Sequence, residues 1–287
     1  MVTLLSRLKN KTSINIEVIL LCAGKGTRFG DITQRVPKPL IKVKKLTNKP
    51  ILYYIIYFLV KAQFKSIKIV TGHLSEKIEA YITSLRQKEW LQEIELELIN
   101  SKDQYKRGPL YSFLSLQENR VFFRRRTLYI ILPGDTLFEP SYFHAIRGLI
   151  NSTKKIIDDH PVVFYIHCKK EDLQKIFNYN KEKAISIIKL IPTQKNYGKK
   201  VQTKSLKEYG TFEFINHVYP TFLLSPNIIK MIIKYEKQIE VSSIKEIINY
   251  LSKRGYTIYA KELEQIYLFY DIDDQSTLQE VYFNEFY

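Results

Sequence analysis

The stretch "LLCAGKGTRFGDITQRVPKPLI" (residues 20–41) runs from an apolar segment into a loop that contains Gly24 and Gly26. The apolar segment belongs to "IEVILLCA" (16–23), which has the continuous apolar character of a strand buried on both faces of a sheet. Two glycines directly after a strand let backbone N–H groups approach a ligand closely, because no Cβ intervenes and a positive φ costs little. Such a loop can bind phosphate, but Gly-Lys-Gly alone is also common at turns that bind nothing.

The segments after the loop alternate between strand and helix patterns. Apolar residues recur at helical spacing after Pro50, which predicts a helix there. Short apolar runs predict strands at 66–72, 94–100 and 127–135, and helical patterns predict helices at about 75–88 and 109–118. This alternation is typical of βαβ units, so we predict an α/β fold with a Rossmann-like, mostly parallel central sheet flanked by helices.

Beyond about residue 150 the pattern changes to strands without long helices between them. We expect these β elements at 162–168, 184–191, 210–214 and 217–224. Two helices (about 226–235 and 242–253), strands at 256–260 and 266–273, and a last helix at about 275–285 complete the prediction. Because we find no internal repeat and no low-complexity linker, we interpret residues 1–287 as a single domain with β elements added in its second half.

Composition and charge narrow the classes of partner. The 287 residues carry 45 Lys and Arg against 29 Asp and Glu, a net charge of +16 that favours anions such as phosphates, nucleic acid or an acidic membrane surface. Nucleic acid is the weaker interpretation, because the aromatic residues fall mostly in core-like positions and not in an exposed stacking pattern. No apolar run approaches the ~20 residues of a membrane span and the first residues lack a signal-peptide pattern, so we expect a cytoplasmic protein without a membrane span.

The two halves of the opening stretch carry a family resemblance when taken together. Gly24-Lys25-Gly26-Thr27-Arg28 is followed by Pro37-Lys38-Pro39. In this combination the sequence resembles the nucleotidyltransferases that make nucleoside-diphosphate sugars from a nucleoside triphosphate and a sugar 1-phosphate, of the glucose-1-phosphate thymidylyl- or uridylyltransferase type. The resemblance implies the nucleotide-diphospho-sugar transferase fold, an EC 2.7.7 activity, a nucleotide-binding half (about 14–150) and an acceptor-binding half (about 151–287).

The chemistry of that family accounts for the two cations of the stretch. Attack of a phosphate oxygen on the α-phosphorus builds charge on the phosphoryl oxygens and on departing pyrophosphate, so the catalyst mainly needs positioned positive charge. The resemblance assigns this catalytic role to Arg28, whose fork of donors suits the leaving phosphates, and to Lys38, which lies between two prolines. The acceptor phosphate is already ionised, with a second pKa near ~6, so no activated serine, cysteine or histidine is required.

The resemblance also assigns the residues that bind the nucleotide. It places the triphosphate on the loop and the residues that lead into it, which are Cys22, Ala23, Gly24, Lys25, Gly26 and Thr27. Gly108, in "YKRGPLYSFLSL" (105–116), occupies the place where the family lets the nucleobase lie against bare backbone. A helix start at Gly-Pro without a ligand is the alternative for Gly108.

Two carboxylates are candidate ligands of a magnesium ion. Asp135 comes directly after a buried strand, at the edge of an α/β sheet where ligands gather, and the resembling family binds Mg²⁺ with a Gly-Asp at this point. The second metal-binding aspartate of that family lies near the C-terminus, where "LFYDIDDQSTLQEV" (268–281) provides Asp271, with Asp273 as a substitute. Carboxylates that share the ion with phosphate oxygens suit Mg²⁺. The structural alternative is that Asp271 or Asp274 caps the last helix.

The acceptor end of the resemblance is incomplete. Sugar-phosphate members carry a Glu-Lys-Pro whose lysine holds the acceptor phosphate, whereas this region reads "IKLIPTQKNYGKK" (188–200) and leaves Lys189 and Lys195 as alternatives. We predict a Mg²⁺-dependent sugar-1-phosphate nucleotidylyltransferase that works by direct in-line displacement. A cytidylyltransferase for phosphocholine or inositol phosphate, and a nucleotide-sensing protein without activity, are the alternatives. A homo-oligomer is left open.

Overall fold

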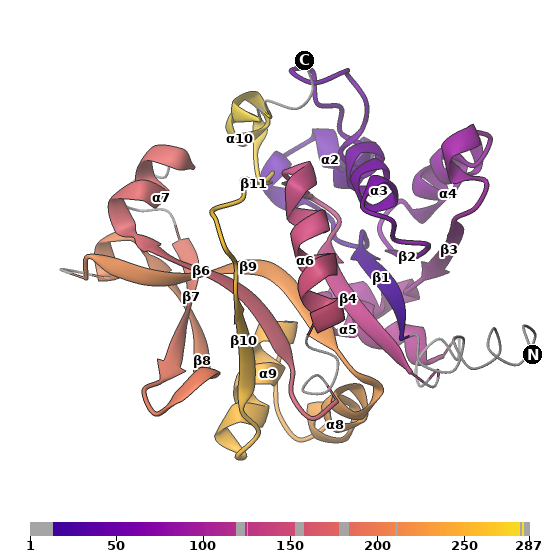
Figure 1. Ribbon diagram of the computed structural model, residues 1–287. Helices are drawn as coiled ribbons and strands as arrows, with labels where there is room; N and C mark the ends of the chain where they lie inside the picture. The colour runs from indigo at the N-terminus through magenta and orange to yellow at the C-terminus, as the bar shows by residue number, and fades with distance from the viewer. Residues whose placement is uncertain are drawn as a thin grey trace, which may run out of the picture.

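A nine-stranded sheet with helices on both faces organises the chain (Figure 1). The computed structural model describes residues 14–118, 124, 126–152, 158–177, 184–209, 212–281 and 283. Within these residues the strand order is β3-β2-β1-β4-β9-β6-β10-β8-β7, and a separate pair, β11-β5, lies beside the sheet.

The first half of the chain forms the parallel part of the sheet, as its alternating pattern predicts. It contains β1 (Asn15–Leu21), β2 (Ser66–Thr71), β3 (Glu95–Asn100) and β4 (Thr127–Pro133). All neighbouring pairs among these four strands are parallel. Their carboxyl ends therefore meet at one edge, where the loops after β1 and β4 lie side by side.

The second half extends this sheet with mainly antiparallel pairs, so the complete sheet is mixed. The added strands are β9 (Phe214–Leu224), β6 (Val162–Lys169), β10 (Ile258–Glu262), β8 (Gln194–Ser205) and β7 (Ala184–Ile191). Only β10 and β6 are parallel among the pairs that involve these strands in the described residues. The expected β additions thus continue the sheet instead of forming a second one.

Helices cover both faces of the sheet and bury two hydrophobic clusters. One face carries α3 (Ile51–Lys61), α4 (Ser75–Leu85) and α6 (Pro140–Ser152), and the other carries α5 (Pro109–Leu114), α8 (Pro226–Glu236) and α9 (Ile244–Lys253). Alternate residues of β1 serve the two clusters: Val18 and Leu20 face the first, and Ile19 faces the second. None of the described helices is both long and apolar enough to cross a membrane.

Several elements of the second half differ from the prediction. The two strands expected at 210–214 and 217–224 are one strand, β9, which begins at Phe214, while residues 210–211 lie outside the described part. Helices α6 and α7 (Lys170–Ile176) and the long strand β8 were not predicted. The last strand and helix are shorter than expected, with β11 at Phe269–Asp271 and α10 at Gln275–Glu280.

The C-terminal segment returns to the end of β4 through the β11-β5 pair. Strand β5 (Thr136–Phe138) follows Asp135, and β11 pairs antiparallel with it so that Asp271 lies opposite Thr136. The Ile272 N–H also donates a hydrogen bond to the Asp135 carbonyl oxygen at 3.1 Å. These contacts bring the aspartates near residue 271 beside Asp135, although nearly half of the chain separates them.

Candidate active site

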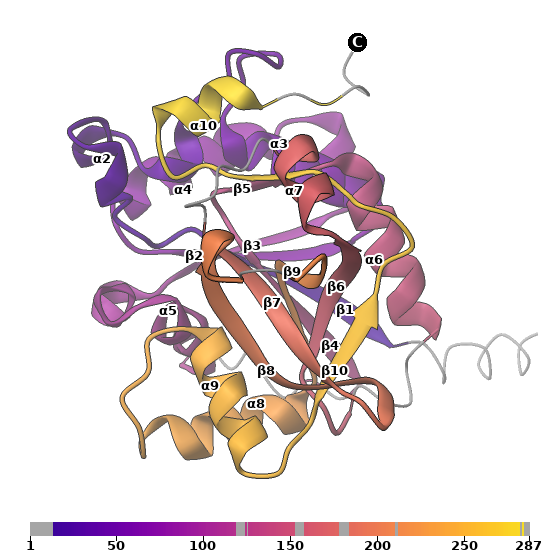
Figure 2. The same ribbon diagram turned by 90° about the vertical axis from the view of Figure 1, so that its left-hand side faces the viewer.

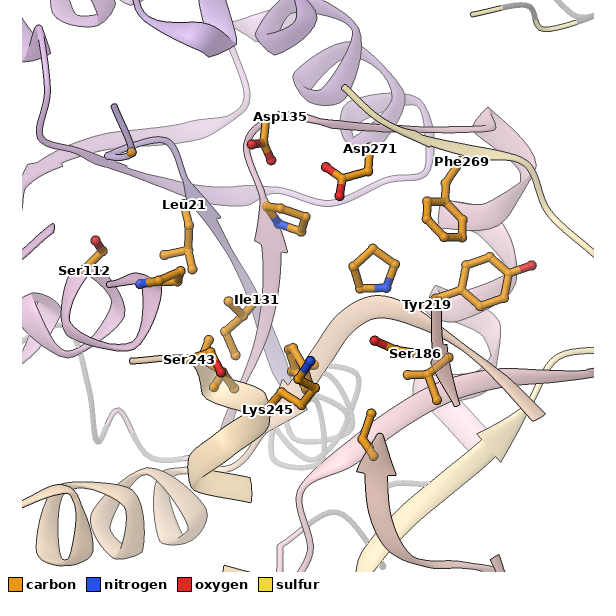
Figure 3. Close-up of a pocket in the computed structure, with 18 of the residues that line it drawn as sticks. Leu21, Ser112, Ile131, Asp135, Ser186, Tyr219, Ser243, Lys245, Phe269 and Asp271 are labelled. Carbon is orange, nitrogen blue, oxygen red and sulfur yellow. The ribbon is translucent and has the colours of Figure 1, made fainter. Parts of the chain in front are cut away.

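A cavity of about 530 Å³ lies at the carboxyl ends of β1 and β4 (Figure 3). Ala23 and Gly24 line it after β1, and Pro133 and Asp135 line it at the end of β4. Residues of the second half, including Tyr219 on β9, line the rest of its wall. The cavity therefore spans the two halves of the domain, in the position where ligands bind to open α/β sheets.

The two glycines of the loop after β1 have different surroundings. Gly26 has φ 64°, and a Cβ there would meet the side chains of Lys38 and Thr33 at 3.1 Å. The Thr33 hydroxyl donates a hydrogen bond to the Gly26 carbonyl oxygen at 2.9 Å, which fixes this turn. A Cβ on Gly24 would instead meet no atom within 4 Å. The fold thus explains a glycine at 26, whereas Gly24 presents bare backbone to the open cavity.

Lys38 is the centre of a charge cluster. Its Nζ donates hydrogen bonds to the carboxylates of Asp135 at 2.7 Å and Asp273 at 3.0 Å, and the residue is only 6% exposed. Burial alone would lower the pKa of the Lys38 ammonium, but the attraction of Asp135, with Asp273 and Asp271, raises it above its ordinary value. Arg28 forms an ion pair with Asp273 from the exposed side. The two predicted catalytic cations therefore meet at one carboxylate, which the sequence analysis treated only as a substitute.

Three aspartates form a group that fits a divalent cation. Oxygen atoms of Asp135, Asp271 and Asp273 lie within 4.8 Å of one another, and each residue is partly buried. The Asp273 N–H donates to the Asp271 carbonyl oxygen at 2.9 Å, a tight turn that keeps these two side chains close. Hard carboxylate oxygens are the donors that Mg²⁺ prefers, and the Lys38 ammonium already lies among them as a cation. The donor set thus fits Mg²⁺.

The helix-cap alternative applies to Asp274 and not to Asp271. Asp274 is the N-cap of α10, and its carboxylate accepts a hydrogen bond from the Thr277 N–H at 2.8 Å. This backbone hydrogen bond is the main cause that lowers the pKa of Asp274. Asp271 lines the cavity, and the Asp273 carboxylate contacts Lys38 and Arg28 instead of capping the helix.

Gly108 is required by the packing of two loops. It has φ +115°, and a Cβ there would lie 2.6 Å from the Ser242 carbonyl oxygen. The same carbonyl accepts a hydrogen bond from the Leu110 N–H at 2.9 Å, which ties the start of α5 to the loop before α9. Gly108 is also the N-cap of α5, with Pro109 as the first helical residue. The expected helix start is therefore present, and its neighbours Pro109 and Ser112 line the cavity.

The remaining residues predicted to bind nucleotide lie at different depths. Cys22 is buried behind the loop, and burial, with the charge of Asp135, raises the pKa of its thiol. Its sulfur and that of Cys168 are free and buried. Lys25 and Thr27 are exposed and do not line the cavity. Among the loop residues of the prediction, Ala23 and Gly24 are the ones that line the cavity.

The acceptor half contributes groups that the sequence analysis did not assign. Lys189 is exposed on β7 and does not line the cavity, and the side chain of Lys195 lies outside the described residues. Lys245 of α9 and His217 of β9 do line the cavity. His217 is buried, its Nδ1–H donates to the Ser186 carbonyl oxygen at 3.2 Å, and burial lowers its pKa to about 4. Lys245 lies in the first turn of α9, and no motif in the sequence marks it as a residue of the cavity.

Comparison with known proteins finds relatives for part of the chain. A sequence model of the family described as nucleotidyl transferase matches residues 17–172. A UTP–glucose-1-phosphate uridylyltransferase from Synechocystis sp. is 36% identical over 66 residues, which cover 23% of this chain and 16% of that protein. A bifunctional protein GlmU from Methanococcus maripaludis is 33% identical over 127 residues, which cover 44% of this chain and 26% of that protein. The chain thus matches about a sixth to a quarter of the length of these relatives.

The fold has solved counterparts as well. A UDP-glucose pyrophosphorylase in complex with UDP-glucose superimposes with a TM-score of 0.66, covering 93% of this chain and 97% of that one at 18% sequence identity. At this identity the likeness concerns the fold. It extends over both halves, including the antiparallel strands for which the sequence resemblance is weak.

Proposed function

Because the chain belongs to the nucleotidyl transferase family, we propose that it transfers a nucleotidyl group from a nucleoside triphosphate to a phosphorylated small molecule, with a sugar 1-phosphate as acceptor and pyrophosphate as leaving group. The observation that carries this proposal is the cluster of Lys38, Arg28 and three aspartates next to the bare backbone of Gly24. A triphosphate needs cations and backbone donors at one edge of the sheet, and this edge supplies both.

The proposed reaction is a direct displacement at the α-phosphorus. An oxygen of the acceptor phosphate forms the new P–O bond, and the bond to the bridging oxygen of the β-phosphate breaks, so its electron pair leaves with pyrophosphate. The acceptor phosphate is ionised near neutral pH and needs no base. Lys38 compensates the charge that develops on the α-phosphoryl oxygens, and Arg28 that on the leaving phosphates.

Asp135, Asp271 and Asp273 are the residues that would hold Mg²⁺ in this scheme. When bound, the ion supplies a Lewis acid for the phosphate oxygens. The protein's own contribution is to keep Lys38 within hydrogen-bond distance of two of these carboxylates, so that cation and ligands are positioned relative to each other. The nucleoside would lie toward the start of α5, where Pro109 and Ser112 line the cavity, and Figure 3 shows Ser112 apart from Asp135 and Asp271.

The test is pyrophosphate release with Mg²⁺, crossing five nucleoside triphosphates against sugar 1-phosphates, phosphocholine and inositol phosphate. We expect release that requires one nucleotide together with one acceptor. Asp135→Asn and Asp273→Asn should each lower kcat by about a hundredfold or more, the usual scale for losing a group that stabilises transition-state charge. Asp172→Asn, on α7, is the matched control and should retain the wild-type rate.

Binding of the triphosphate is measured separately by calorimetry. Wild-type protein that binds a triphosphate but releases no pyrophosphate with any acceptor would contradict transfer and favour the nucleotide-sensing alternative. Full activity in both site variants would show that the aspartates are not part of the reaction centre.

A further inference from the structure

A lysine lies on the wall of the cavity opposite the aspartates. Lys245 and Ser243 reach the cavity from the start of α9, and Figure 3 shows them across the space from Asp135 and Asp271. The reaction proposed above uses Arg28 and Lys38 on the aspartate side, so it gives Lys245 no role.

The packing of α9 on β8 holds Lys245 in this place (Figure 2). The Asn249 amide donates to the Val201 carbonyl oxygen at 2.8 Å and accepts from the Val201 N–H at 2.9 Å. One helical turn earlier Lys245 donates to the hydroxyl of Thr203, two residues along the same strand. One turn of α9 thus corresponds to two residues of β8, and the two contacts together fix the direction of the Lys245 side chain.

Thr203 connects Lys245 to further polar groups of the acceptor half. Its hydroxyl shares a hydrogen bond of 2.8 Å with the hydroxyl of Ser186 on β7, and Ser186 lines the cavity. The Ser186 carbonyl oxygen accepts from His217 Nδ1. Lys245, Ser186 and His217 thus form a polar wall from three elements of the second half.

The charge of Lys245 is not balanced as the charges of Lys38 and Lys68 are, the two lysines that are buried among the described residues. Lys38 contacts two carboxylates, and Lys68 contacts Glu95 and Glu97 at 3.3 and 2.6 Å. In the described part of the chain no carboxylate lies within ion-pair distance of Lys245 Nζ.

The nearest acidic residue in sequence is already engaged. The Glu246 carboxylate accepts hydrogen bonds from the Ser242 and Ser243 N–H groups at 2.8 and 2.9 Å, as part of the capping box of α9. Burial lowers the pKa of Lys245, and Glu246 offsets this only in part. A partly buried cation that faces a cavity without a counter-ion is stabilised by an anionic ligand.

We propose that Lys245 binds a second anionic group of the acceptor, a carboxylate or phosphate distinct from the phosphate that attacks. This inference rests on the proposed transfer reaction, which requires the attacking phosphate to lie on the opposite wall, near Lys38 and the aspartates. An acceptor that spans the cavity then presents its far end to Lys245 and Ser186. The substrate class is therefore a sugar phosphate, or a molecule of similar size, with an additional negative charge.

The experiment compares acceptors that differ only at the far end. Glucose 1-phosphate, glucuronic acid 1-phosphate and glucose 1,6-bisphosphate share the attacking phosphate and ring, and the last two add a carboxylate or a phosphate. The kcat/KM for pyrophosphate release is measured for each with wild type and with Lys245→Met, Lys245→Arg and Lys253→Met. Lys253 is an exposed lysine of the same helix and provides the matched control.

Wild type, Lys245→Arg and Lys253→Met should prefer an acceptor with the second charge by about tenfold to a hundredfold, the scale of one charge-assisted hydrogen bond. Lys245→Met should lose most of that ratio. The carboxylate and phosphate arms identify which anion fits. Equal use of all three acceptors by wild type, or an unchanged ratio in Lys245→Met, would overturn the proposal.

A binding measurement separates this inference from the proposed reaction. With the triphosphate present, the rise in Tm caused by glucuronic acid 1-phosphate or the bisphosphate, relative to glucose 1-phosphate, is recorded for the same four proteins. If wild type releases no pyrophosphate but the extra rise is lost only in Lys245→Met, the transfer proposal fails and the anion site stands. If the extra rise is absent from wild type or equal in all four proteins, the anion site fails.

Discussion

At the scale of single residues, His217 shows how the cavity wall sets a pKa. The imidazole is buried, stacks on Phe269 with ring centroids 5.7 Å apart, and donates to the Ser186 carbonyl oxygen. Burial penalises the charged form and lowers the pKa to about 4 from the ordinary 6.5. Above pH 6.5 the ring is neutral in both the folded and the unfolded chain, so His217 adds no pH dependence there. Between these two values only the unfolded chain binds the proton.

We therefore expect the free energy of unfolding to fall as the pH is lowered from about 6.5 to about 4, by up to about 3 kcal/mol from this residue. Urea unfolding of wild type and His217→Phe is measured at several pH values in this range. Carboxyl groups also titrate in this range, but they do so in both proteins, so the difference between the two pH profiles reports His217. The variant keeps a ring against Phe269 but loses the bond to Ser186, so it should be less stable at pH 7 and less dependent on pH. Parallel pH profiles for the two proteins would refute the assignment.

At the scale of elements, the glycines of the loop after β1 and of the α5 start differ in whether they serve the fold or face the cavity. Gly26 and Gly108 have positive φ and close neighbours, whereas Gly24 faces open space. Gly24→Ala should therefore unfold at nearly the wild-type Tm but bind triphosphate at least tenfold more weakly, because the new methyl group lies where the phosphates approach. Gly26→Ala and Gly108→Ala should lose about 1–3 kcal/mol of stability, the usual cost of a strained backbone conformation.

Thermal unfolding and a calorimetric titration with triphosphate, done on all three variants, check this contrast. Gly108→Ala is expected to be the less stable of the two strained variants, since its Cβ would meet the Ser242 backbone and not flexible side chains. Unchanged triphosphate affinity in Gly24→Ala would show that the loop does not hold the phosphates.

The elements also show which parts of the fold the sequence can predict. The parallel strands of the first half are continuous apolar runs, and their periodicity identifies them without knowledge of their partners. Strand β8 reads "QKNYGKKVQTKS" and offers little apolar alternation, because much of it is exposed near the edge of the sheet. Helix α6 does carry a sequence signal, although the strand-rich pattern around it does not predict a helix: Pro140 starts it, and Tyr142, Phe143 and Ile146 follow at helical spacing.

The candidate site likewise contains residues that local motifs predict and residues that only tertiary contacts bring into place. Arg28, Lys38 and Asp135 follow from local motifs, but the choice between Asp271 and Asp273 depends on how β11 pairs with β5. Asp271 and Asp273 lie two residues apart in one short segment, so the sequence alone does not decide which of them contacts Lys38. The position of Lys245 depends in turn on the contact of α9 with β8, a tertiary contact that no local pattern reports.

At the scale of the whole molecule, one charge cluster joins the beginning, middle and end of the described chain. Lys38 contacts Asp135 and Asp273, which are 97 and 235 residues away in sequence. Asp271 also lies within the cluster. Without the Lys38 ammonium the three carboxylates would repel one another, so the lysine keeps this arrangement from being unfavourable. Lys38 therefore has a structural role as well as a role in the proposed chemistry.

Removal of the lysine should separate these two roles. Lys38→Met leaves three carboxylates facing one another without the cation. In EDTA we expect its free energy of unfolding to be lower than that of wild type by about 2 kcal/mol. This loss is smaller than for a fully buried ion pair, because the Asp135 side chain is 32% exposed. Mg²⁺ should then raise the Tm of Lys38→Met more than that of wild type, since the ion meets carboxylates that Lys38 no longer neutralises. Thermal unfolding over a Mg²⁺ series, with Lys253→Met as control, measures this. Equal Mg²⁺ shifts in Lys38→Met and wild type would mean that the ion does not bind at this cluster, and the magnesium assignment would have to be given up even if the protein released pyrophosphate.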